Sequence, residues 1–154
     1  MNKMVCFDMD GTIADLYGVK GWLEYLQAEN PWPYLAARPM CDMDALRDVL
    51  LKLKEQGWEI RVISWLAKDS SEAYKDAVRM AKMGWLLNFN FPMDACHLVA
   101  YGTTKADCVR RYHSEGDNFI LIDDNSKVRN GWHMGDTIDP TMVNIVDALR
   151  GLVE

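Results

Sequence analysis

Short apolar segments alternate with segments of helical periodicity along the whole chain. We expect the apolar segments to be β-strands, and they cover Met4–Phe7, Glu59–Ile63, His97–Ala100 and Phe119–Ile122. Strands that are apolar on both faces fit a parallel sheet covered by helices on each side. The pattern therefore predicts an α/β fold, a three-layer α/β/α sandwich around a doubly wound parallel sheet.

The helical segments are recognised by apolar residues at every third or fourth position. One helix is expected from Asp42 to Gln56, a second from Ser70, and a shorter one from about Thr104. Near the end of the chain, an extended piece at 134–138 precedes Asp139-Pro140. This pair suits the N-cap and the first turn of a last helix.

The stretch of residues 16–38 interrupts this alternation. It holds a possible short amphipathic helix at Val19–Ala28 and a loop around Pro31-Trp-Pro33. A chain of 154 residues has the size of one domain, and the insert is too small to be another. We therefore expect a single domain, residues 1–154, with 16–38 as a small flap or cap.

Two aspartates, Asp8 and Asp10, directly follow the first strand, and Gly11 and Thr12 come next. Residues two apart on an extended chain point the same way, so both carboxylates can face one site. Carboxylates held that close repel each other and lose hydration unless a cation lies between them or one keeps its proton. The motif indicates chemistry rather than a contribution to stability.

Polar residues also follow the other strands. Ser64 ends the second strand, Asp123 and Asp124 follow the fourth, and Lys105 opens the helix before it. Ligands of open parallel sheets bind at the carboxyl ends of the strands. We therefore expect all of these side chains to meet at one edge of the sheet.

In this order the residues resemble the four motifs of haloacid dehalogenase (HAD) superfamily phosphohydrolases. The chain has a strand ending in F-D-M-D-G-T at 7–12, a strand ending in Ser64, an isolated Lys105, and a strand ending in I-L-I-D-D at 120–124. The resemblance covers nearly the whole chain. It implies the HAD-like Rossmannoid sheet and a phosphohydrolase activity.

The resemblance also implies a site for Mg²⁺, a hard cation that prefers oxygen ligands. The ligands would be Asp8, the backbone carbonyl of Asp10, and Asp123. Asp124 would bind the ion directly or through water.

Further roles follow from the resemblance. Asp8 would attack phosphorus and form an aspartyl-phosphate, and Asp10 would protonate the leaving alkoxide and then activate water. Lys105 would neutralise phosphate oxygens, while Ser64 and the loop amides near Asp10 would donate hydrogen bonds to them. The acid at position 10 favours phosphoryl transfer, because superfamily members that break carbon–halogen bonds lack it.

The candidate substrate-binding residues are Gly11, Thr12, Tyr17, Trp22 and Trp65. The aromatic ones either pack the insert as its own small core or form a stacking wall for a planar group such as a nucleobase. Small superfamily members with similar motifs include deoxyribonucleotide 5′-nucleotidases. Those proteins have a larger helical cap than the insert here.

The composition points to a reducing compartment and an acidic surface. The four cysteines show no C-x-x-C pair, no apolar run approaches membrane-spanning length, and the first strand begins too early for a signal peptide. The net charge of −6 argues against long nucleic acid as the main partner. We expect a cytoplasmic protein without membrane contact.

The predicted function is Mg²⁺-dependent hydrolysis of a phosphate monoester, with a nucleotide or another small phosphorylated metabolite as substrate. A minimal cap also fits a phosphatase of nucleic-acid 3′ or 5′ ends, or a site that an oligomer partner closes. A different class is a non-catalytic phosphate-sensing domain. Receiver domains share the aspartyl-phosphate chemistry, but they carry their acids and lysine in another order.

Overall fold

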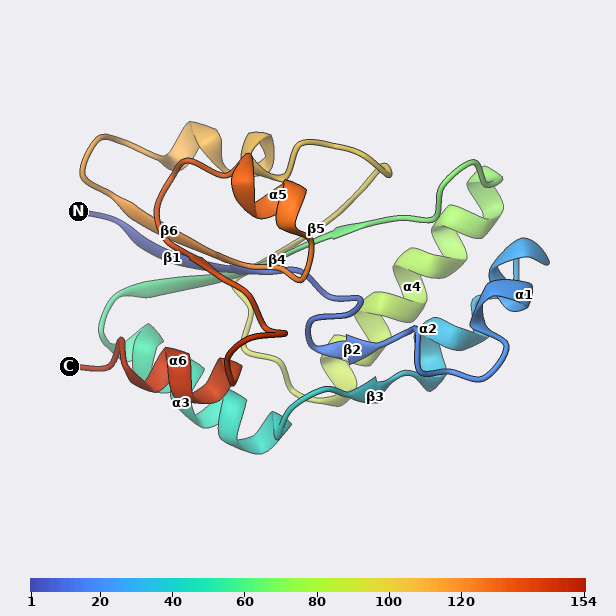
Figure 1. Ribbon diagram of the computed structural model, residues 1–154, viewed down its shortest axis with the longest axis horizontal. Helices are drawn as coiled ribbons and strands as arrows, with labels where there is room; N and C mark the ends of the chain where they lie inside the picture. Colours follow the sequence, from blue (N-terminus) through green and yellow to red (C-terminus); the bar gives the residue numbers. More distant parts are fainter.

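The computed structural model describes residues 1–154 and has a five-stranded parallel β-sheet at its centre (Figure 1). The strands are β1 (Lys3–Phe7), β4 (Trp58–Trp65), β5 (Ala95–Val99), β6 (Asn118–Ile122) and β7 (Thr137–Ile138). They lie in the order β5-β4-β1-β6-β7, and Val5 of β1 is opposite Ile60 and Ile120 of its two neighbours. The expected strands are confirmed, and the extended piece at 134–138 supplies β7.

Helices cover both faces of this sheet (Figure 1). One face carries α3 (Met43–Glu55), α4 (Glu72–Asn88) and α6 (Ile145–Arg150), and the other carries α5 (Ser126–Asn130) and the 3-10 turns η1 (Lys105–Cys108) and η2 (Arg110–Tyr112). The larger hydrophobic cluster lies on the first face around Phe7, and a smaller one lies on the second face around Trp132. The expected α/β layers are therefore confirmed. None of these helices combines the length and hydrophobicity that a membrane span needs.

The chain winds away from β1 in both directions. It passes through α3 and α4 to reach β4 and β5 on one side, and then returns over the opposite face to β6 and β7. The strand order therefore reverses between β1 and β6, the point at which open parallel sheets bind ligands. The loops after Phe7 and Ile122 lie at this point.

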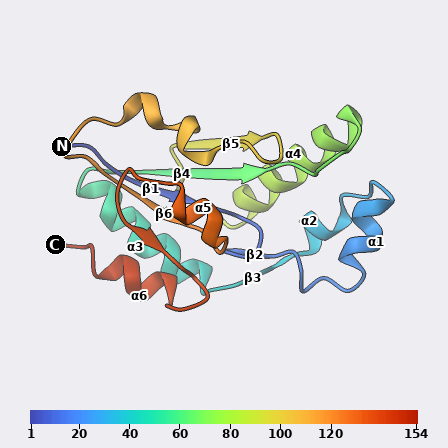
Figure 2. The same cartoon turned by 45° about the horizontal axis from the view of Figure 1, so that its top comes forward.

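The insert lies at the carboxyl ends of the strands. It is flanked by an antiparallel pair, β2 (Ala14–Asp15) and β3 (Arg38–Pro39), and it contains α1 (Trp22–Gln27) and α2 (Trp32–Ala36). Tyr34 of α2 is buried in one cluster with Tyr74 and Val78 of α4, so the insert packs on the body of the fold. Figure 2 shows α1 and α2 beyond the ends of β1 and β4.

Two predictions within the insert are corrected by the structure. The helix expected at 19–28 is shorter, because Gly21 has a left-handed φ of 76° and α1 begins only at Trp22. The loop expected at 31–33 is instead the start of α2. Pro33 does not prevent this helix, since an amide hydrogen in the first turn has no helical partner to lose.

Two later helix predictions are also wrong. The helix expected from about Thr104 is instead the 3-10 turn at Lys105–Cys108, which ends where Val109 leaves the helical region with a φ of −128°. The last helix does not begin at Asp139-Pro140, since Asn144 is the N-cap of α6. The Asp139 carboxylate instead accepts from the amide and the hydroxyl of Thr141 and stabilises a separate turn.

Glycine is required beside β6 and is dispensable in α4. A Cβ on Gly135 would lie 2.6 Å from the backbone oxygen of Phe119 and 2.8 Å from its nitrogen, whereas a Cβ on Gly84 would meet open space. We expect Gly135→Ala to lower the free energy of unfolding by about 2 kcal/mol, as overpacking does. Gly84→Ala should raise it by about 0.5–1 kcal/mol, because alanine favours the helix. Urea denaturation measures both, and changes of the same sign would contradict this prediction.

Candidate active site

A cavity of about 310 Å³ lies where the strand order reverses. The predicted side chains that line it are Asp8, Asp10, Tyr17, Trp22, Ser64, Trp65, Lys105, Asp123 and Asp124. The lining residues that were not predicted are Leu16, Leu26, Tyr34, Leu66, Ala67, Lys68, Tyr101, Asn125 and Val128. Two predicted candidates, Gly11 and Thr12, do not line it.

Three carboxylates form a cluster in this cavity. Oxygen atoms of Asp8, Asp123 and Asp124 lie within 4.8 Å of one another. The neighbouring parallel strands β1 and β6 bring them together, because Asp8 follows the first and the other two follow the second. Lys105 Nζ donates to Asp8 Oδ1 at 2.8 Å and to Asp123 Oδ2 at 2.7 Å. The predicted lysine and the predicted acids are thus in direct contact.

Gly11 and Thr12 hold these carboxylates from outside the cavity. Gly11 has a φ of 79°, which glycine adopts readily, and a Cβ there would collide with the Asp124 carboxylate. The Thr12 hydroxyl donates to Asp8 Oδ2 at 2.8 Å and accepts from the Asp124 amide at 3.2 Å. The Gly-Thr pair therefore joins the loop after β1 to the loop after β6.

A second lysine, Lys82 of α4, was not among the predicted site residues. Its Nζ donates to Asp10 Oδ2 at 2.7 Å and to Ser64 Oγ at 2.8 Å. The Asp10 carboxylate therefore lies outside the three-carboxylate cluster, although it is only two residues from Asp8. The signal in the sequence is a lysine on the apolar face of a helix, four residues after Val78.

Charge and burial together shift the pKa values in the cavity. Burial raises the pKa of Asp123, and the neighbouring Asp8 adds to this shift. Burial likewise raises the pKa of Asp10, against the opposing charge of Lys82. Burial alone lowers the pKa of Lys105, but Asp8 and Asp123 outweigh it and the net shift is upward. Counted formally, the three carboxylates of the cluster exceed their one lysine partner, Lys105, by two negative charges.

The donor set of the three-carboxylate cluster fits a hard divalent cation. It consists of carboxylate oxygens, the ligands that Mg²⁺ and Ca²⁺ prefer. Asp8 and Asp123 are both buried, and ionised carboxylates at that depth cost several kcal/mol without positive partners. These two residues and Asp124 could hold such an ion. The Asp10 side chain takes no part, because its carboxylate binds Lys82.

Two aromatic pairs form walls of the cavity. Tyr17 and Trp22 of the insert meet edge to face with 5.0 Å between their ring centroids. Trp65, the last residue of β4, and Tyr101, which follows β5, also have their ring centroids 5.0 Å apart. The indole N–H of Trp65 donates to the backbone oxygen of Thr103 at 2.8 Å, which fixes the ring. These walls offer flat apolar surfaces beside the carboxylates.

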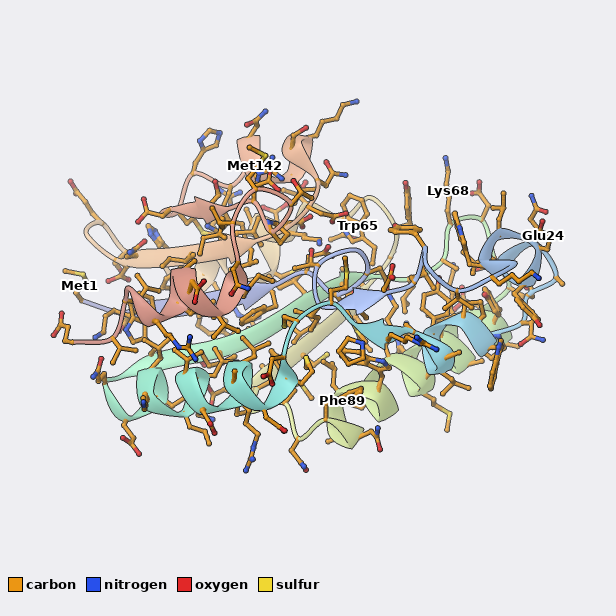
Figure 3. All side chains as sticks on the ribbon, turned by 60° about the horizontal axis from the view of Figure 1, so that its bottom comes forward. Met1, Glu24, Trp65, Lys68, Phe89 and Met142 are labelled. Atoms are coloured by element: carbon orange, nitrogen blue, oxygen red, sulfur yellow. The ribbon has the colours of Figure 1, made fainter.

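An exposed lysine stands next to one of these walls. Lys68 lines the cavity, and its Nζ lies 5.6 Å from the centroid of the Tyr101 ring. Figure 3 shows Trp65 and Lys68 on the same side of the molecule, with Glu24 at the outer end of the insert. The positive charge suits a ligand that carries negative charge.

The raised pKa of Asp124 makes the metal-free protein sensitive to pH. Burial, followed by a hydrogen bond with Asp8 and the charges of Asp8 and Asp123, raises this pKa from 3.8 to about 7. Between these values the folded state binds more protons than the unfolded state, so the free energy of unfolding falls as pH rises. We expect Asp124→Asn to match the wild-type Tm near pH 4 and to exceed it near pH 8 in EDTA.

Thermal unfolding followed by circular dichroism at several pH values measures this difference. Asp48→Asn, at an exposed position of α3, is the control and should keep the wild-type pH dependence. A Tm difference between Asp124→Asn and the wild type that stays constant with pH would contradict the prediction.

Comparison with models of protein families gives no match to this chain. A search of curated proteins likewise finds no relative.

Proposed function

We propose that the protein hydrolyses phosphate monoesters in the presence of Mg²⁺, with Asp8 as the nucleophile and an aspartyl-phosphate as the intermediate. The observation that supports this most is the contact of Asp8 with Lys105 inside the three-carboxylate cluster. In this proposal the chain is a HAD-like phosphohydrolase, as the order of its motifs suggests. The insert at 16–38 is then its small cap.

Asp8, Asp123 and Asp124 would hold the Mg²⁺ ion, and the backbone carbonyl of Asp10 is a further proposed ligand. When bound, the ion offsets negative charge, which lets a dianionic ester approach a carboxylate nucleophile. The formal excess of two negative charges in the three-carboxylate cluster equals the charge of one such ion. The charge of the cluster therefore supports the proposed cofactor.

Asp8 is held in one orientation. Its Oδ1 accepts from Lys105 at 2.8 Å, and its Oδ2 accepts from Thr12 at 2.8 Å. In the first step one of these oxygens forms a bond to phosphorus while the bond from phosphorus to the leaving oxygen breaks. Lys105 lines the cavity and offers its charge to the phosphate oxygens as well.

Asp10 lines the same cavity and is the proposed acid and base. In the first step its carboxyl group gives a proton to the leaving alkoxide. In the second step the carboxylate takes a proton from the water that cleaves the aspartyl-phosphate. Burial favours the protonated acid before the first step, because it raises the pKa of Asp10. The cycle restores both aspartates and releases the alcohol and inorganic phosphate.

Ser64 is the proposed donor to the transferred phosphate. Its Oγ accepts a hydrogen bond from Lys82 at 2.8 Å, so its own hydrogen remains for an oxygen in the cavity. A donor held in advance stabilises developing charge without reorganising during the reaction. The position of Ser64 at the end of β4 supports this role.

The proposed substrate is a nucleotide or another small phosphorylated metabolite. The cavity volume of about 310 Å³ is in the range of small-molecule sites, and Tyr17, Trp22 and Trp65 offer rings on which a planar group can stack. The net charge of −6 supports a small substrate over long nucleic acid. All four cysteines are free thiols, which supports the proposed cytoplasmic location.

Removal of the proposed nucleophile tests the mechanism. Asp8→Asn should abolish Mg²⁺-dependent phosphate release from para-nitrophenyl phosphate, because an amide cannot form the acyl phosphate. Asp10→Asn should also stop turnover, since the second step loses its base. A colorimetric phosphate assay measures both, with the exposed Asp48→Asn as control. Near-wild-type turnover by Asp8→Asn would show that another residue is the nucleophile.

The aromatic wall is tested by substrate preference. Trp65→Ala should lower kcat/KM for nucleoside monophosphates by about tenfold or more, because stacking of a base on an aromatic ring contributes about 1–3 kcal/mol. A small phosphate ester without a ring should be affected much less. Trp32→Ala is the matched control, since Trp32 is exposed and does not line the cavity. Equal losses for both ester types would argue against stacking.

A panel of nucleotides, sugar phosphates and end-phosphorylated oligonucleotides separates the remaining alternatives. Salt-sensitive binding of oligonucleotides would favour a phosphatase of nucleic-acid ends. No phosphate release from any member of the panel with Mg²⁺ would contradict hydrolysis and favour a phosphate-sensing domain.

A further inference from the structure

Lys82 uses all three of its N–H donors. They go to Asp10 Oδ2 at 2.7 Å, to Ser64 Oγ at 2.8 Å and to the backbone oxygen of Trp65 at 2.7 Å. The residue is 0 % exposed and does not line the cavity. It therefore cannot touch a substrate, and any effect on a reaction must pass through its partners.

The partners of Lys82 come from two different strand ends. Asp10 belongs to the loop after β1, while Ser64 and Trp65 are the last residues of β4. Tyr34 of the insert covers the ammonium group, with its ring centroid 5.1 Å from Nζ. One buried charge on α4 thus fixes the position of one strand end relative to the other.

The ion pair distinguishes the two oxygens of Asp10. Oδ2 accepts from Lys82, and Oδ1 has no hydrogen-bond partner in the protein. The Asp10 side chain is 17 % exposed and lines the cavity, so Oδ1 is the oxygen that remains for a substrate. Because the hydrogen bond to Oδ2 fixes the carboxyl group, it also fixes the direction in which Oδ1 points.

We propose that Lys82 is a positioning residue for the hydrolysis proposed above, on which this inference rests. It directs Asp10 Oδ1 toward the leaving oxygen and turns the Ser64 hydroxyl hydrogen toward the phosphate. In the first step the proton moves from Oδ1 to the leaving oxygen as the bond to phosphorus breaks. In the second step Oδ1 takes a proton from the attacking water.

Stability alone does not account for a lysine at this position. Replacing a buried ion pair by apolar side chains is often neutral or stabilising. Lys82 lies on the apolar stripe of α4 between Val78 and Leu86, both of which are fully buried. An unbranched side chain such as methionine fits the space on this stripe, but Lys82→Met leaves the Asp10 carboxylate without its cation, so the variant is expected to unfold at a lower temperature than the wild type.

The test compares two esters with different leaving groups. Para-nitrophenyl phosphate releases a phenolate that needs no proton, whereas an alkyl phosphate releases an alkoxide that does. We expect Lys82→Met to lower kcat/KM for the alkyl ester by about 100-fold or more, in the range of lost general acid catalysis, and for the aryl ester much less. Lys75→Met on the same helix is the matched control, because Lys75 pairs with Glu72 at the surface. It should leave both values unchanged.

The choice of kcat/KM limits the measurement to the formation of the aspartyl-phosphate. Equal losses for both esters, or no loss for either, would overturn the positioning role, since a merely structural defect does not distinguish leaving groups. A wild-type protein inactive toward both esters would instead overturn the proposed hydrolysis. If Lys82→Met does not fold, Lys82→Gln replaces it, because its shorter, uncharged side chain has only two N–H donors and cannot hold Asp10, Ser64 and Trp65 together. The same selective loss is expected, and a wild-type ratio of the two esters would overturn the proposal.

Discussion

The two aspartates at the end of β1 impose the constraint on which the rest of the structure depends. Asp8 and Asp10 are two residues apart and largely withdrawn from water, so each needs a positive partner. Lys105 reaches Asp8 from the turn after β5, and Lys82 reaches Asp10 from α4. Both lysines are far from their partners in the sequence. The two ion pairs can therefore form only when β1 lies between β4 and β6 and α4 packs on the first face of the sheet.

Separate lysines also give the two aspartates different surroundings. Asp8 shares its cation with Asp123 in the three-carboxylate cluster, whereas Asp10 shares its cation with the neutral hydroxyl of Ser64. Two carboxyl groups in different environments can carry different roles in one reaction. Asp8 is the proposed nucleophile beside the proposed metal ion, and Asp10 is the proposed acid away from it. This division follows because the two lysines come from different elements of the fold. A single cation between the aspartates would have made their environments alike.

Residues at strand ends were predictable because a parallel sheet brings all of its carboxyl ends to one edge. Asp8, Ser64 and Asp123 needed only the apolar runs before them to be placed. Lys82 was missed because a lysine in a helix usually faces water, although its place on the apolar face of α4, four residues after Val78, is the signal that it is buried. The 3-10 turn at Lys105–Cys108 was predicted as a helix because its end is not visible in the sequence. This end depends on one backbone angle at Val109, which leaves no periodic pattern.

Within the insert, α2 packs more closely on the body of the fold than α1 does. Tyr34 of α2 is buried against α4 and covers Lys82, while α1 contributes no buried side chain. A change in α2 would therefore reach Asp10 through Lys82, whereas a change in α1 meets the cavity only through lining residues such as Trp22. In the proposed function α2 is linked to the reacting groups, whereas the sequence of α1 can differ according to the part of the substrate that does not react. In the proposed function this arrangement separates residues that would recognise a substrate from those that would position the reacting groups, although a single insert of residues 16–38 carries both helices.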